Sequence, residues 1–207
     1  MSTNTNQIEE QLNDLRAKVT QLEVELERSR QVEPWQARRF YTAYYVVTGF
    51  MLGMVAALSS LMFNIVGSLL TNQHPLKLIQ VYLTFPLGEK AFEPEMQGGL
   101  ALAIGCCLYL GTGMLLGIPF QLVMARLNQE TLTQRLIVGT VLGVVIWIVN
   151  FYVILSWLQP ALFGGNWIVE MIPWWVGLLT HLVFGWTMAL VYPLGTYSPY
   201  RLQTEQL

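Results

Sequence analysis

The chain has 207 residues, of which 54% are hydrophobic and only 12% are charged, whereas a soluble domain carries about 25% charged residues. This composition excludes an ordinary water-soluble domain. The net charge of −2 and the pI near 5.7 give no reason to expect a nucleic-acid partner.

Charged residues are absent from four long windows, and these windows define the fold class. No Asp, Glu, Lys or Arg occurs in residues 40–76, 96–125, 136–169 or 171–200. A helix needs about 20 apolar residues to cross a bilayer core about 30 Å thick, so each window holds one span. The sequence therefore predicts an all-α integral membrane protein, a four-transmembrane-helix bundle made of two hairpins.

The N-terminal residues carry a heptad pattern. Apolar residues recur at alternating spacings of four and three: Ile8, Leu12, Leu15, Val19, Leu22 and Leu26. In a parallel dimer, Lys18 would face Glu23 and Glu25 would face Arg30 across this seam, and both pairs attract. We therefore expect residues 1–34 to form a coiled-coil helix that makes the chain a homo-oligomer. A single solvated amphipathic helix is the alternative.

Pro34 is expected to end this helix, and residues 35–43, with basic and aromatic side chains, to form an interfacial anchor. The transmembrane domain is then residues 44–200 and the polar tail is 201–207. Within the domain, the sequence predicts spans at about 44–69, 98–120, 136–157 and 172–193.

The longest connection between spans is expected to hold an outer surface segment at residues 75–95. Leu76, Ile79 and Leu83 have the spacing of a short amphipathic helix lying on the membrane surface. Pro86 and Gly88 are expected to stop this helix, and the charged residues that follow are read as a solvated loop.

The distribution of lysine and arginine predicts the orientation in the cell membrane. Nine of these residues lie in the N-terminal segment, the loop before the third span and the tail, whereas the two opposite connections hold two. Positive residues favour the cytoplasmic side. We therefore expect both termini, and with them the coiled coil, in the cytoplasm.

Glycines indicate where helices pack closely. The first span contains Gly49 and Gly53, and the second contains a GxxxG motif at Gly113 and Gly117. Such small residues let two helix backbones approach each other. In a glycine-rich span the motif favours packing inside the bundle more than dimerisation.

Two matching patterns suggest an internal repeat. The first and third spans share G-x-x-L-G-x-V, and the second and fourth share G-x-x-M-x-L-x-x-P, beginning at Gly111 and Gly185. A duplicated hairpin related by an axis along the membrane normal would give this pattern. Chance matches between apolar segments are the alternative.

Polar residues inside the spans are the candidate site. They form one expected intramembrane polar cluster: His181, Asn150, Asn64, Ser60 and Cys107. Ionisable groups within the membrane are costly and are candidates for function, and we expect His181 to hydrogen-bond Asn150 or Ser60. Under the repeat, Cys107 would correspond to His181. His181 has three possible roles: a structural tie between helices, a proton relay or substrate contact, and a haem ligand paired with a second copy.

No catalytic pattern is found: HExxH, GxSxG and Walker motifs are absent. We expect no enzymatic activity, no metal site and no cofactor. The sequence favours a structural, accessory or assembly subunit of a membrane complex, whose partners are the lipid bilayer, a second copy and another membrane protein. One alternative is a small transporter or channel with a polar layer at Asn64, Asn150 and His181. A haem-carrying electron-transfer subunit is a weaker alternative.

Overall fold

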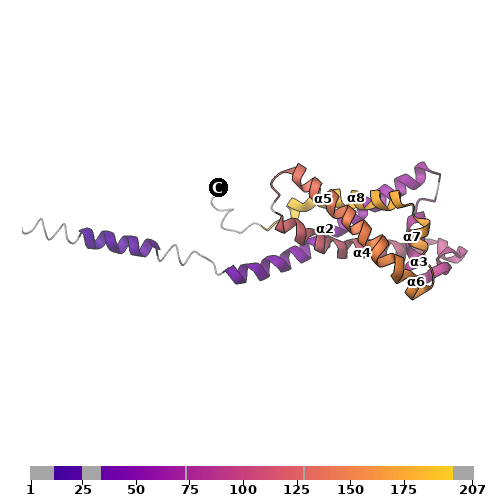
Figure 1. The fold of residues 1–207 in the computed structure, drawn as a ribbon, viewed down its shortest axis with the longest axis horizontal. Coiled ribbons are helices and arrows are strands. Elements are labelled where there is room, and N and C mark those ends of the chain that lie inside the picture. Colours follow the sequence, from indigo (N-terminus) through magenta and orange to yellow (C-terminus); the bar gives the residue numbers. More distant parts are fainter. Residues whose placement is uncertain (1–11, 25–33, 73, 128, 198–207) are drawn as a thin grey trace, which may run out of the picture. The chain divides into compact units, whose positions relative to one another are not determined.

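A computed structural model of the chain describes residues 12–24, 34–72, 74–127 and 129–197, and all their regular secondary structure is helical (Figure 1). Four helices are long and apolar enough to cross a membrane: Tyr41–Leu70, Gly99–Arg126, Leu132–Phe163 and Trp174–Gly195. The prediction of an all-helical chain with four helices that could span a membrane is confirmed for the described residues. The chain divides into two units, Met1–Thr42 and Ala43–Leu207, and each is described by itself.

In the N-terminal unit, residues 12–24 form a helix. The described seam residues of this helix are all exposed: Leu12, Leu15, Val19 and Leu22. Lys18 Nζ lies 2.9 Å from Asp14 Oδ2, one turn earlier on the same helix. The other seam residues, Ile8 and Leu26, lie outside the described residues, as do Glu25 and Arg30. The described part of the seam is thus an exposed apolar stripe.

The first span belongs to helix α2 (Pro34–Leu70). Residues 35–43, predicted as a separate anchor, are the first turns of this same helix. Proline is well tolerated at a first helical position, where its missing N–H would have no intrahelical partner.

The other spans are α4 (Gly99–Arg126), the third span, and α8 (Trp174–Val191), which is followed by the short helix η4 (Tyr192–Gly195). The third span begins as α5 (Leu132–Ile148), widens into a π-helix, η3 (Val149–Leu155), and continues as α6 (Ser156–Phe163). Thr131 starts α5 with a capping box that it forms with Gln134. The third span is therefore longer than predicted, and the π-helix was not predicted.

The connections after the first and third spans pack onto the spans. Helix α3 (Lys77–Leu87) is followed by η1 (Gly88–Phe92) and η2 (Pro94–Gln97), and α7 (Trp167–Met171) lies between the third span and α8. Helix α3 contacts α4, α6 and α7.

Helix α3 carries the predicted apolar residues but does not have one free polar face. It buries Ile79, Val81, Leu83 and Thr84, so neighbours cover it on more than one side. Gly105 of α4 has no side chain and makes room for it: a Cβ there would lie 2.6 Å from Ile79 Cγ2. Gly88 ends the helix at a φ of 59°, a left-handed conformation that favours glycine.

Each hairpin is held by a crossing of glycines. In the first hairpin, a Cβ on Gly49 would lie 2.7 Å from Gly117 O, and Gly53 packs in the same way against Gly113. Here the GxxxG motif is used within the chain. Helix backbones in direct contact gain dispersion energy, and larger side chains would prevent this close approach.

The second hairpin repeats this geometry. A Cβ on Gly139 would lie 2.8 Å from Gly185 O, and one on Gly143 would lie 2.8 Å from His181 O. By these contacts Gly185 corresponds to Gly117. The sequence motif instead aligned Gly185 with Gly111, which lies six residues earlier than Gly117. The two crossings are equivalent, but the motif alignment of the second and fourth spans is out of register with them. The duplication itself stays a prediction.

Candidate functional site

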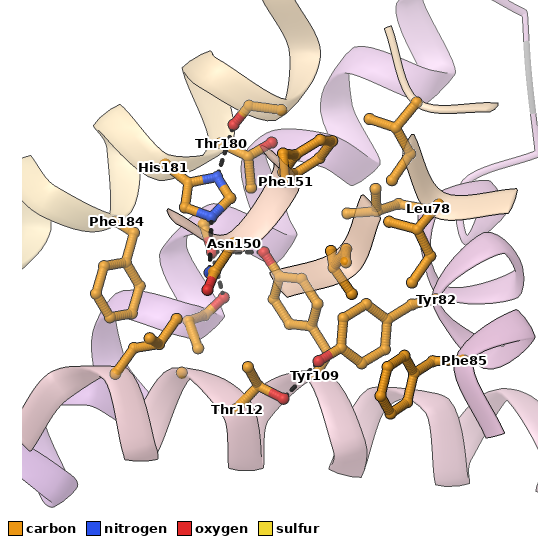
Figure 2. Close-up of a pocket in the computed structure, with 18 of the residues that line it drawn as sticks. Leu78, Tyr82, Phe85, Tyr109, Thr112, Asn150, Phe151, Thr180, His181 and Phe184 are labelled. Carbon is orange, nitrogen blue, oxygen red and sulfur yellow. Dashed lines mark hydrogen bonds between the residues drawn. The ribbon is translucent and has the colours of Figure 1, made fainter. Parts of the chain in front are cut away.

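His181 lies on α8 and faces the π-helix of the third span. Its Nδ1 is 2.8 Å from Gly177 O, so Nδ1 carries the proton and donates it. The other ring nitrogen, Nε2, is 3.3 Å from Asn150 Nδ2 and therefore accepts from the amide (Figure 2). The histidine thus uses both nitrogens as a neutral imidazole does. This bond links α8 to the third span.

Asn64 belongs to a different pair. Its side chain is buried on α2, and Nδ2 donates to Thr180 Oγ1 at 2.9 Å and to Ser60 O at 2.7 Å. The Thr180 hydroxyl in turn donates to Val176 O. The predicted polar layer is therefore divided, because Asn64 joins α2 to α8 through the residue next to His181.

Two hydroxyl pairs lie near these residues. Ser60 Oγ lies 2.8 Å from the Tyr109 hydroxyl and donates to Ala57 O, so Tyr109 is the donor between them. On α3, the Tyr82 hydroxyl bonds to Thr112 of α4. Burial raises the pKa of Tyr82, an effect opposed by the hydrogen bond to Thr112, and the phenol keeps its proton at neutral pH.

Cys107 does not belong to this cluster. It is exposed on α4, and its neighbour Cys106 is half-buried. In the alignment that the glycine contacts define, Gly113 rather than Cys107 is equivalent to His181. The expectation that placed Cys107 there followed from the motif alignment that is out of register.

A cavity of about 530 Å³ lies beside His181, between the spans and α3. Figure 2 shows His181, Asn150 and Phe184 on one side of it and Leu78 and Phe85 on the other. Most of its lining is apolar. Its volume falls within the range of about 300–1,000 Å³ that is usual for ligand sites, which commonly combine apolar walls with a few polar groups.

The donor set for a haem is not assembled within one chain. His181 Nε2, the nitrogen facing away from its own helix backbone, is engaged by Asn150. His74 is exposed beyond the end of α2, and its Nδ1 accepts from the Leu76 amide at 3.2 Å. In the part of the chain that the structure describes, no three His, Cys, Asp or Glu residues are grouped as metal ligands.

Several buried polar residues were missed from the sequence. Gln159 on α6 is fully buried, donates to Thr84 Oγ1 at 3.0 Å and accepts from Ile168 N at 3.1 Å. Gln121 on α4 is also fully buried and donates to Gly195 O at 3.2 Å. The available signal was a polar amide inside a charge-free window, which is costly unless it is hydrogen-bonded.

Comparisons with models of known protein families, with curated proteins and with solved structures found no match. Function is therefore inferred from this chain's own residues. Their arrangement combines helix-to-helix hydrogen bonds, an exposed apolar seam on the N-terminal helix and a mainly apolar cavity.

Proposed function

We propose that this chain is a structural, accessory or assembly subunit of a membrane complex and that it self-associates through its N-terminal helix. One observation carries the proposal: three pairs of polar side chains in the spans bind one another. Asn64 bonds to Thr180, Ser60 to Tyr109 and Asn150 to His181, and each pair joins two different helices. Such pairs hold a bundle together, and their partners leave them little freedom to serve a transport step.

The exposed seam supports self-association. Leu15 and Leu22 are 61% and 63% exposed, and burying this apolar stripe against a second copy would release its hydration water. In a parallel dimer Lys18 gains Glu23 of the other helix in addition to Asp14 of its own. Attachment to membrane spans raises the effective concentration of the helices and favours pairing.

The placement of the charges supports an orientation with both termini in the cytoplasm. The coiled coil would then act in the cytoplasm, and the 75–95 segment would face the other side. Helix α3 and the turns after it, with exposed Glu89, Lys90 and Glu93, would form the contact surface for a partner membrane protein.

The chain offers a matched pair of variants that tests self-association. Val19 lies in the seam and Val24 on the opposite, f face of the helix, and the two are 53% and 47% exposed. Val19→Asp is expected to lower the mass of the detergent-solubilised particle to that of a monomer, because a buried carboxylate in the seam has no partner. Val24→Asp is expected to leave the mass unchanged. Equal masses for wild type and Val19→Asp would refute the proposal.

The cavity beside His181 favours one second candidate, a small transporter or channel. In that case His181→Ala would abolish solute or proton flux in liposomes while the bundle stays folded. The structural role predicts instead a loss of about 1 kcal/mol of stability, because Asn150, which is half-buried, would lose its hydrogen bond to His181. Measuring flux and thermal stability on the same sample separates the two functions.

A further inference from the structure

We propose that the cavity beside His181 binds a neutral lipid alcohol, a molecule with an apolar body and a hydroxyl head, and that Asn150 holds the hydroxyl. This binding site goes beyond the structural role proposed above. The cavity holds about 530 Å³ and is lined by residues of α2, α3, α4, the π-helix and α8, so a molecule in it would contact both hairpins and α3.

The lining determines the charge of the occupant. None of the residues that line the cavity is an Asp, Glu, Lys or Arg. His181 is in contact with Asn150 and with the carbonyl of Gly177, as a neutral ring. A charged headgroup would lose its hydration in this cavity and gain no counter-ion, which is strongly unfavourable. The occupant is therefore neutral.

The hydrogen bonds at the cavity determine the head group of the occupant. The hydroxyls that line the cavity are already paired: Ser60 with Tyr109, Tyr82 with Thr112, and Thr180 with Asn64. Asn150 is different: its Nδ2 faces His181, and its Oδ1 makes no hydrogen bond with any described residue. Because His181 Nε2 must accept, the amide cannot be reversed without losing this bond. This carbonyl oxygen is open to a donor, and a hydroxyl is the commonest neutral donor of a lipid.

The backbone supports this assignment. Asn150 is the second residue of the π-helix Val149–Leu155, and Phe151, which follows it, also lines the cavity. A π-helix widens the turn and changes the direction of the side chains on it. Such segments cost helix stability and are frequent at functional sites. The third span thus departs from a regular α-helix at the residue that would hold the head.

The apolar body would extend away from Asn150. Leu78 and Phe85 of α3 line the opposite side of the cavity (Figure 2). Leu108 of α4 also lines the cavity and is 41% exposed, so it stands at a border between the cavity and the outer surface of the bundle. A larger side chain at Leu108 would obstruct the cavity without disturbing the buried core.

The test uses the full chain in lipid nanodiscs and a photoreactive long-chain alcohol as the probe. Its methyl ether, which lacks the donor, and its sulfate ester, which is charged, are the control probes. The alcohol is expected to label peptides that line the cavity, chiefly those of the π-helix and of residues 177–184, and both controls are expected to label them much less. Labelling of these peptides by the sulfate or by the ether at the level of the alcohol would overturn the proposal.

Two variants locate the site. Leu108→Trp is expected to prevent labelling. Leu115 lies seven residues later on α4, is exposed and does not line the cavity. Leu115→Trp is therefore expected to leave labelling unchanged. Asn150→Leu is expected to weaken alcohol binding about tenfold, which corresponds to about 1.4 kcal/mol. Unchanged labelling in either Leu108→Trp or Asn150→Leu, with Leu115→Trp folded and labelled normally, contradicts the assignment.

Discussion

The crossing of α2 and α4 offers a sharp test of how the bundle is held together. A Cβ added at Gly117 would lie 2.6 Å from Gly53 Cα and 2.9 Å from Gly53 N, and it would also meet Gly49 O. These are backbone atoms of a helix, which cannot move aside singly, so the two helices must separate. Overpacking of this kind costs about 1–3 kcal/mol.

The same helix provides the control. Gly111 has no atom within 4 Å of an added Cβ, and replacing a helical glycine by alanine stabilises a helix by about 0.5–1 kcal/mol. This gain is common to both variants and cancels in their difference. Gly117→Ala is therefore expected to be about 1–3 kcal/mol less stable than Gly111→Ala.

The assay is the thermal stability of both variants in the same detergent, followed by the loss of the monodisperse peak in size-exclusion chromatography. Gly117→Ala is expected to lose this peak at a clearly lower temperature than Gly111→Ala. Equal stability of the two variants would refute the direct backbone contact at Gly117.

Two further predictions concern the buried amide of Gln159 and the orientation of the chain. Gln159→Leu leaves the Ile168 amide without its acceptor and is expected to cost about 1–3 kcal/mol of stability, measured in a thermal melt. The control is Gln80→Leu on α3. Its side chain makes no hydrogen bond to a described residue, so the melting temperature should change little. With Cys106 and Cys107 replaced by serine, a membrane-impermeant maleimide added to intact cells is expected to label Lys90→Cys and not Val24→Cys, because the proposed orientation, based on the positive residues, puts the N-terminal helix inside. The reverse pattern would show the orientation to be wrong.

The number of spans could be predicted from the sequence because it depends on one strong physical requirement. A bilayer core excludes charged side chains, so windows such as 40–76 and 136–169 reveal the spans without any knowledge of packing. The predicted span limits were less accurate. Gln121 and Arg126 lie within α4 beyond the predicted end at residue 120, because a helix continues past the hydrocarbon region while its backbone hydrogen bonds remain favourable.

The candidate site could be predicted only in part. Asn150 and His181 were selected because polar groups at similar depth in a membrane tend to find each other, and they lie in contact. The partners of Asn64 and Ser60 were not predicted. Thr180 and Tyr109 face them only because of the rotation of each helix about its own axis. Hydropathy contains no information on that rotation.

The π-helix and the register of the crossings also needed the structure. Residues 149–155 form an ordinary apolar run in the sequence, and nothing in its composition requires a wider turn. The motif at Gly111 and Gly185 matched residue types, whereas the contact between Gly49 and Gly117 depends on the relative shift of two helices. Such shifts are set by packing.

Self-association through the N-terminal helix is tested most directly by cross-linking in membranes. In a chain with both native cysteines replaced by serine, Leu15→Cys places a thiol in the seam, where residue 15 of a parallel dimer meets its own copy. Mild oxidation of isolated membranes is expected to give a disulfide-linked dimer for Leu15→Cys and none for Val24→Cys. A monomer for Leu15→Cys, or equal dimer yields for the two variants, would contradict the account.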